Sequence, residues 1–364
     1  MSTSSASPAA PRPTPRREAW EPFDGALGLL ADRGPNLRNG LTSHLPMVAE
    51  ALCALDRPEA VMPWVRRHRG QALPWPAAVE PLGLGSWRGA LGRPERATDW
   101  RGFFRAELTG SPWRRVLRTW SRRLAPGLSA AALHGLLRTG HVVRALGVED
   151  TVPRRSELGD ALATWAAWYQ ELPGRPGSEP LGRVQPREAL AYVTPLAPEK
   201  RRYAGSIVSS LEALGPDFAP VIDFFEPQGE VEPLAWELGA LFSEVFLASA
   251  HDPLSCIVFT HGVTGFGAIS HLARHLGADM GLSLLRYGWQ AACGLYVAFG
   301  THPIQAPPEH FDVRAPEELA ERAVGSGDDH AIKLTEACLG LHARLGSSAP
   351  LAAAHRALTL LPPA

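Results

Sequence analysis

Residues 128–146 read LSAAALHGLLRTGHVVRAL and show the helical periodicity that dominates this chain of 364 residues. The larger apolar residues recur at spacings of three and four, which places on one helix face Leu133, Leu136, Leu137, Val143 and Leu146. We expect Ser129 to cap the N-terminus of this helix. His134 and His141 lie seven residues apart on one stripe, so both are expected to face inward.

Similar periodicity predicts further helices, over residues 43–55, 113–124, 157–172, 233–247, 282–297 and 329–345. Clusters of Pro and Gly separate these segments, and no alternating strand of useful length or fixed-period repeat is evident. The pattern therefore predicts the all-α class, with a single large helical domain over residues 19–364 and Pro/Gly-rich connecting loops. Residues 1–18 are rich in Ser, Pro, Ala and Arg, and we expect a disordered tail there.

Composition narrows the possible partners. With 45% hydrophobic residues and 11 Trp, the chain can bury a substantial core. Its 36 basic and 37 acidic residues nearly cancel, which argues against nucleic acid or an anionic membrane as a partner. No uninterrupted apolar run of membrane-spanning length and no signal peptide is evident, so we expect a cytoplasmic protein. The cysteines are widely spaced in apolar settings and are expected to be buried free thiols: Cys53, Cys256, Cys293 and Cys338.

One segment resembles the start of a dinucleotide-binding unit. Residues 257–277 read IVFTHGVTGFGAISHLARHLG and suggest a strand, a glycine turn and a helix. The spacing of Gly262, Gly265 and Gly267 does not match the fingerprint, and no strand ends at the position of the expected acidic residue. We therefore discount a nucleotide-binding fold.

Only Lys200 and Lys333 among the 36 basic residues are lysines. Lys333 shares an apolar helical stripe with His330, Leu334 and Leu341, so it is predicted to be buried. A buried lysine that loses its proton is a nucleophile, which can form an iminium with a carbonyl or take up carbon dioxide as a carbamate. The alternative is a surface lysine that extends to solvent beside Glu336.

Several other histidines also occupy apolar settings. His44 is expected in the first turn of its helix, where the dipole keeps an imidazole neutral, although a hydrogen-bonded turn histidine is the alternative. His261 follows an apolar run. His271 and His275 have the i, i+4 spacing of zinc ligands, but we prefer a structural role near the end of a helix.

Taken together, five blocks resemble the questin oxidase-like family of aromatic polyketide oxygenases. They are LTSHLPMVAEAL (41–52), WRGALG (87–92), APGLSAAALHGLLRTGHVVRAL (125–146), FTHGVTGFGAISHLARHL (259–276) and DDHAIKLTEAC (328–338). The blocks span about 300 residues in the expected order. The resemblance implies a helical enzyme that acts on anthraquinone-type substrates, either as a non-heme iron dioxygenase or as a Baeyer–Villiger-type oxidase.

For the iron members, the resemblance implies four histidines and a carboxylated lysine around one Fe(II). The matching positions are His44, His134, His261, His330 and Lys333, with His141 or His271 as alternatives to His261. Such a ligand set leaves one octahedral position for dioxygen or water.

Residues near the ligands have expected supporting roles. We assign catalysis to Lys333, His141 and Glu50, and expect Glu50 and Glu336 to fix imidazole tautomers. Aromatic walls for a flat substrate are expected from Trp165, Trp168, Tyr169, Phe259, Phe266 and Trp289.

The sequence thus favours an iron-dependent oxygenase that cleaves a C–C bond, or inserts oxygen, next to the quinone carbonyl of an aromatic polyketide. The alternatives are a metal-free oxidase that uses NADPH and a helical binding protein without catalysis. The exact substrate, the bond broken and the oligomeric state are not specified by the sequence.

Overall fold

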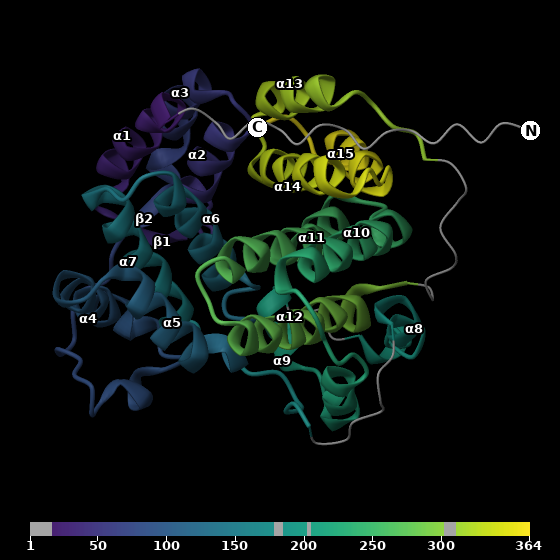
Figure 1. Ribbon diagram of the computed structural model, residues 1–364, viewed down its shortest axis with the longest axis horizontal. Helices are drawn as coiled ribbons and strands as arrows, with labels where there is room; N and C mark the ends of the chain where they lie inside the picture. Colours follow the sequence, from purple (N-terminus) through teal and green to yellow (C-terminus); the bar gives the residue numbers. More distant parts are fainter. Residues whose placement is uncertain (1–16, 178–184, 202–204, 302–310) are drawn as a thin grey trace, which may run out of the picture.

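The computed structural model describes residues 17–177, 185–201, 205–301 and 311–364, and these are mostly helical (Figure 1). The predicted all-α class is confirmed. The α-helices are α1 (Glu21–Leu30), α2 (Leu45–Ala54), α3 (Pro58–His68), α4 (Ala97–Gly110), α5 (Trp113–Leu124), α6 (His134–Val148), α7 (Val152–Ala167), α8 (Pro186–Ala191), α9 (Ile207–Glu212), α10 (Val231–Ser249), α11 (Pro253–Ala273), α12 (Ala278–Phe299), α13 (Pro316–Ser326), α14 (Asp329–Leu345) and α15 (Ala349–Leu360).

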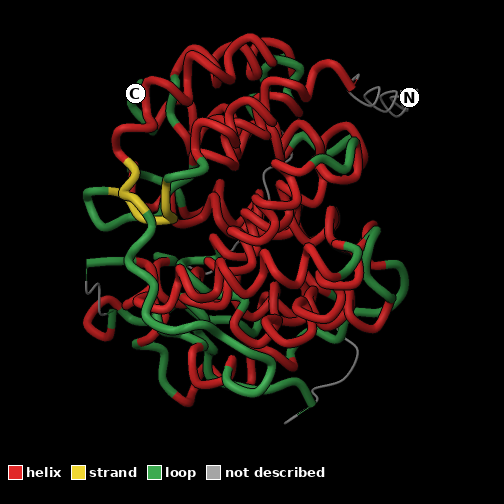
Figure 2. Tube along the Cα trace, turned by 90° about the vertical axis from the view of Figure 1, so that its left-hand side faces the viewer, coloured by secondary structure: helices red, strands yellow, loops and turns green. Residues whose placement is uncertain are grey.

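Short 3-10 helices and two strands complete the described secondary structure. The 3-10 helices are η1 (Arg17–Trp20), η2 (Arg69–Gln71), η3 (Trp87–Ala90), η4 (Pro94–Arg96), η5 (Ala125–Gly127), η6 (Pro198–Lys200) and η7 (Pro216–Asp223). Strand β1 (Arg33–Leu37) pairs antiparallel with β2 (Ala72–Pro74), with Arg33 opposite Pro74 and Leu37 opposite Ala72. Figure 2 shows this small sheet beside the helices rather than inside them.

The predicted helices all form, with shifted ends in most cases. Segments 113–124 and 329–345 coincide with α5 and α14, whereas segment 157–172 starts five residues too late and runs five residues too far. Residues 1–16 of the expected tail lie outside the described residues, and Arg17 and Glu18 already belong to η1. The four cysteines are free and buried, as predicted.

The N-terminus of α6 differs from the prediction. The helix begins at His134, because Ala131, Ala132 and Leu133 have left-handed backbone conformations with φ of 49°, 56° and 69°. Consecutive left-handed residues cannot belong to a right-handed helix, and each costs roughly 1–2 kcal/mol outside glycine. Ser129 is not the cap, since its hydroxyl donates to the carbonyl of Gln170. The left-handed turn places His134 at the very start of α6.

Four helices surround the centre of the protein. Helix α2 packs on α6 and α14, and α11 packs on the same two helices, so that α6 and α14 lie at opposite corners. Helix α11 runs through the middle of the molecule in Figure 1. Gly140 permits the close approach of α6 to α11, because a Cβ at that position would lie 2.5 Å from the Cβ of Ala268.

Helix α11 contains most of the segment that resembles a dinucleotide-binding unit. It is helical from Pro253 to Ala273, so the strand and glycine turn of such a unit do not form there. Within the described residues, α11 is also the one helix long and apolar enough to cross a membrane, and 78% of its apolar window is buried inside the protein. Core helices of this kind pass the same test, so the feature is weak evidence for a membrane span.

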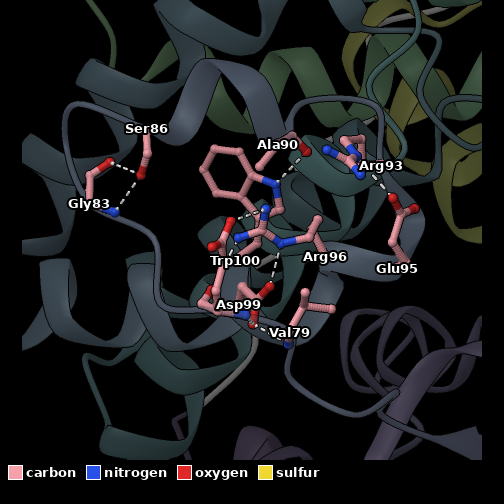
Figure 3. Close-up of polar contacts among 10 residues, drawn as sticks. Val79, Gly83, Ser86, Ala90, Arg93, Glu95, Arg96, Asp99 and Trp100 are labelled. Atoms are coloured by element: carbon pink, nitrogen blue, oxygen red, sulfur yellow. Dashed lines mark hydrogen bonds and ion pairs between the residues drawn. The ribbon is translucent and has the colours of Figure 1, made fainter.

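A second buried polar region lies away from these four helices, where the loop before α4 folds over Trp100 (Figure 3). Asp99 accepts hydrogen bonds from the backbone of Val79 and Glu80 and pairs with Arg96. The indole of Trp100 donates to the carbonyl of Ala90 over 3.0 Å. These bonds tie an irregular loop to a helix.

Candidate metal centre

Each of the four central helices contributes one histidine to a common cluster. His44 is the N-cap of α2, His134 begins α6, His261 lies within α11 and His330 is the second residue of α14. All four side chains are buried. The ring centroids of His44 lie 4.6 Å from those of His134 and His330, and the ring of His261 lies 4.9 Å from His134 and 5.8 Å from His330. The four imidazoles therefore meet at one place.

Asp329 orients two of these rings. Its Oδ2 lies 2.6 Å from Nδ1 of His44, and its Oδ1 lies 2.7 Å from Nδ1 of His330. A carboxylate only accepts hydrogen bonds, so each Nδ1 carries the proton and each Nε2 is left with its lone pair. Carboxylates commonly orient metal-ligating histidines in this way.

Backbone carbonyls orient the other two rings. Nδ1 of His261 donates to the carbonyl of Ile257 over 2.7 Å, and Nδ1 of His134 donates to the carbonyl of Ala131. Ala131 is the first residue of the left-handed turn before α6, so this strained turn supplies the acceptor for His134. All four Nδ1 atoms thus have partners outside the cluster.

The Nε2 atoms face one another. Nε2 of His134 lies 2.5 Å from Nε2 of His44 and 3.5 Å from Nε2 of His261. Neutral imidazoles with protonated Nδ1 atoms have only lone pairs at these positions, and such lone pairs repel unless a proton or a metal cation lies beside them. The arrangement matches the donor set of a cation site.

The surroundings keep the imidazoles of His44, His134 and His261 neutral. Burial lowers the pKa of His44 to about 3 despite the opposing effect of Asp329, and burial together with neighbouring imidazoles lowers the pKa values of His134 and His261 well below the usual range. Metal ions bind the neutral form of imidazole. His44 and His134 also lie at helix N-termini, where the helix dipole disfavours a proton.

Lys333 follows His330 by one turn of α14 and is only 2% exposed. Among the described residues its ammonium group has no hydrogen bond and no ion pair. Burial lowers the pKa of Lys333 to about 8, against the smaller opposing effects of Asp329 and Asp328. The positive charge of Lys333 lowers the pKa values of His44, His134 and His261, which places it close to the cluster. With this pKa, about a tenth of the buried amine is unprotonated at pH 7, far more than for an ordinary lysine.

A different metal position would use Asp329 directly. Ligand atoms of His44, Asp329 and His330 lie within 4.8 Å of one another. However, both oxygens of Asp329 already accept the Nδ1 protons of the two rings. The Nε2 side of the cluster offers more donors without breaking these bonds, so we favour it.

Glu50 and Glu336 do not hold the four histidines, contrary to the sequence-based expectation. Glu50 is fully buried, and its Oε2 lies 2.6 Å from Nδ1 of His141. Both oxygens of Glu50 also accept hydrogen bonds of 2.6 Å from Arg144, which pairs in addition with Glu336. The carboxylate that does fix imidazole tautomers is that of Asp329. In the sequence, Asp329 looks like an ordinary helix-capping residue beside Asp328.

A cavity of about 1170 Å³ lies next to this second cluster. It is lined by parts of α6, α11 and α14 that follow the histidines, including His141, Arg144, His271, Lys333 and Glu336. In each helix the histidine comes first in the sequence and the residues at the cavity follow it. The four helices therefore run in one direction, from the histidine cluster toward the cavity. Lys333 lies between the histidine cluster and the cavity.

The expected aromatic walls lie elsewhere. None of the six aromatic residues lines this cavity; Trp165 and Trp289 instead donate to the carbonyls of Gly127 and Val221 in the core. His141 and His271 also lie outside the histidine cluster, since His141 binds Glu50 and His271 lines the cavity. His275 packs against Trp113. Of the three alternatives for the fourth imidazole, the structure therefore brings His261 to the cluster.

Comparisons with known proteins do not identify a function, so the assignment of the site depends on the geometry above. No family model matches the chain, and no curated protein matches it either.

Proposed function

We propose that this protein is a non-heme iron-dependent oxygenase that acts on a quinone-type aromatic polyketide. The proposed reaction is oxidative C–C bond cleavage, or oxygen insertion, next to a quinone carbonyl. The observation that carries the proposal is the cluster of four imidazoles, each with Nδ1 bound to an outside acceptor, in which the Nε2 atoms of His44, His134 and His261 face one another. The choice of iron and of a quinone substrate rests on the resemblance of the sequence to questin oxidase-like oxygenases.

The donor set fits a first-row metal ion. Imidazole nitrogens suit iron, zinc, copper and nickel, whereas calcium and magnesium prefer oxygen donors. In this proposal His44, His134, His261 and His330 hold the ion, and Asp329 keeps two of the rings in the required tautomer. Iron(II), when bound, would supply the activation of dioxygen.

Lys333 provides an anionic ligand in this proposal. Its neutral amine adds to carbon dioxide, so that an N–C bond forms, a proton leaves the nitrogen for solvent, and a carbamate with two oxygens results. The buried ammonium lacks a partner among the described residues, and three nearby helix N-termini favour negative charge. Both features favour the carbamate over the ammonium.

The cavity is the proposed substrate site. Its volume of about 1170 Å³ is at the upper end of ordinary ligand pockets, which suits a polycyclic molecule. Lys333 connects it to the histidines, so a substrate held there would reach the metal from that side. The reaction would take place at the inner end of the cavity, next to Lys333.

Metal analysis tests this proposal directly. The protein would be purified, loaded anaerobically with Fe(II), freed of excess metal and measured by plasma mass spectrometry. We expect about one iron per chain, together with oxygen consumption when a hydroxylated anthraquinone is added. Protein that binds no iron at saturation would refute the metal site. Consumption of NADPH with the quinone, without metal, would instead support the alternative metal-free oxidase.

A further inference from the structure

The second polar cluster has one open position. His141 uses Nδ1 to bind Glu50, and its Nε2 has no hydrogen-bond partner among the described residues. The ring lines the cavity, and 11% of its side chain remains exposed. Nε2 is therefore the nitrogen that a molecule in the cavity can reach.

The contact with Glu50 fixes the tautomer of His141. Glu50 accepts the Nδ1 proton, which leaves the lone pair on Nε2. The cluster contains two carboxylates, Glu50 and Glu336, but a single guanidinium, Arg144. Glu50 thus holds the ring so that Nε2 can accept a proton from a molecule in the cavity.

The groups facing this cluster come from all four helices. They are Glu50 of α2, Arg144 of α6, His271 of α11, and Lys333 and Glu336 of α14. Burial, followed by the positive charge of Arg144, lowers the pKa of His271 well below its usual range, so His271 stays neutral. His141 is the one imidazole of this group with a carboxylate behind it.

The far wall of the cavity carries positive charge. Arg274 and Arg344 both line it, and Arg344 lies over the ring of Trp236 at 4.9 Å from the centroid. Arg274 pairs with Glu232, whereas Arg344 has no carboxylate within ion-pair distance among the described residues. An anion formed in the cavity would meet this guanidinium.

We infer that His141 is a general base that removes the proton from a phenolic or enolic hydroxyl of the substrate, with Glu50 and Arg144 as positioning residues. The substrate class is thus a hydroxylated, acidic aromatic compound. In the step, the O–H bond breaks, an N–H bond forms at Nε2, and the electron pair stays on oxygen as a phenolate. No oxidant is needed. The inference rests on the proposed function for its aromatic substrate, but not on the metal.

The test follows the ionisation of a bound probe. 1,2-Dihydroxyanthraquinone would be titrated into the full-length, metal-loaded protein, and again after removal of metal by a chelator. Its phenolate absorbs at longer wavelength than its phenol, so visible spectra across pH give the apparent pKa of the bound hydroxyl. We expect binding to lower this pKa by about one unit or more, a tenfold gain in phenolate, in both preparations.

Variants assign the effect to His141. His141→Gln can still donate to Glu50 but cannot take up a proton, so the shift should disappear while the probe still binds. Glu50→Gln serves as a second variant and should diminish the shift, because a neutral amide can still accept from Nδ1 but no longer compensates the positive charge that His141 gains in the step. His271→Gln removes another imidazole of the same cavity and should leave the shift intact.

Three results would overturn the inference. They are failure of the probe to bind, a full shift with His141→Gln, and loss of the shift when metal is removed, which would assign deprotonation to the metal. Failure of the proposed function gives a different result, namely absence of iron binding and of oxygen consumption. A protein without a metal would still show the His141-dependent shift in the chelated sample.

Discussion

The polar cluster around Asp99 and the histidine cluster around Asp329 are both buried, but their donors and acceptors balance differently. Around Asp99, a guanidinium and two backbone amides all bind one carboxylate (Figure 3). The opposite charges are therefore paired, and each donor has an acceptor. Around Asp329, the carboxylate satisfies only the outer nitrogens of His44 and His330. The inner nitrogens of the cluster, the Nε2 atoms of His44, His134 and His261, face one another as acceptors.

This difference separates a structural cluster from a binding site. Buried polar groups in folded proteins almost always have partners, since an unsatisfied one costs about 1–3 kcal/mol. The cluster at Asp99 obeys that rule within the protein and ties a loop to α4. The inner nitrogens of the histidine cluster obey it only when a cation is present. Experiments that remove each cluster should therefore affect different properties.

The largest expected effect is the loss of metal from His134→Ala. This ring lies between His44 and His261, so its removal takes one of four donors and opens a gap between these two. We expect iron content to fall from about one per chain to near zero and turnover to disappear, while circular dichroism still shows a folded helical protein. Alanine is also the better helix former at the start of α6.

Asp99→Ala is the matched variant from the other cluster. It leaves Arg96, which is 5% exposed, without its closest carboxylate, and it should lower the free energy of unfolding by about 3 kcal/mol. Iron content of the folded protein should stay unchanged. If Asp99→Ala lost its metal as completely as His134→Ala, the separation between the two clusters would be wrong.

The next effect concerns the two lysines. Lys333→Arg keeps a positive charge but cannot lose its proton or take up carbon dioxide, so activity should be abolished. Lys200→Arg makes the same change at an exposed position of η6 and should have no effect. Lys333→Glu restores an anionic oxygen on a shorter side chain, and we expect some iron with poor activity. Native mass spectrometry should show about 44 Da on the wild type but not on Lys333→Arg, the mass of one added carbon dioxide.

A fully active Lys333→Arg protein would show that neither a carbamate nor a neutral amine at this position is needed for activity. In that case the absence of a partner for Lys333 would have no chemical role.

The fold was predictable because its helices are long and periodic. Segments such as 113–124 and 329–345 combine an apolar stripe with clear ends, and the structure reproduces their limits. The start of α6 was not predictable, because alanine and leucine normally favour a helix, whereas Ala131, Ala132 and Leu133 adopt left-handed conformations. Tertiary contacts, including the hydrogen bond between His134 and the carbonyl of Ala131, outweigh local propensity here.

The site was predictable only in part. The burial of His44, His134, His261, His330 and Lys333 followed from their apolar surroundings, and the sequence resemblance grouped them. The role of Asp329 was missed because its neighbour Asp328 gives the same sequence signal, and only the structure shows which of the two caps α14. The partners of Glu50 were missed because they depend on how α2 packs against α6.

These adjacent aspartates give a matched pair for a smaller effect. Asp329→Asn removes a carboxylate that orients two rings, so metal affinity should fall by about 10–100-fold, as measured by competition with a chelating dye. Asp328→Asn makes the same change of charge one residue away. Asparagine still accepts from the amides of His330 and Ala331 as a helix cap, so affinity should be retained. Equal losses from the two variants would indicate a general electrostatic effect.

A last expected effect is on acid stability, through Glu50. Burial raises the pKa of Glu50, but the charge of Arg144 and the hydrogen bonds from Arg144 and His141 outweigh this effect and hold the pKa below its usual value. The unfolded chain therefore binds this proton more readily, so the stabilisation is present above about pH 4.5 and is lost as pH falls through the lower folded pKa. We expect Glu50→Gln to cost about 3 kcal/mol at pH 7, from the loss of buried ion pairs, and progressively less below pH 4. Urea unfolding of wild type, Glu50→Gln and the exposed control Glu199→Gln across this range measures the difference. A cost that stayed constant from pH 7 to pH 3 would mean that packing of Glu50, rather than its charge, stabilises the cluster.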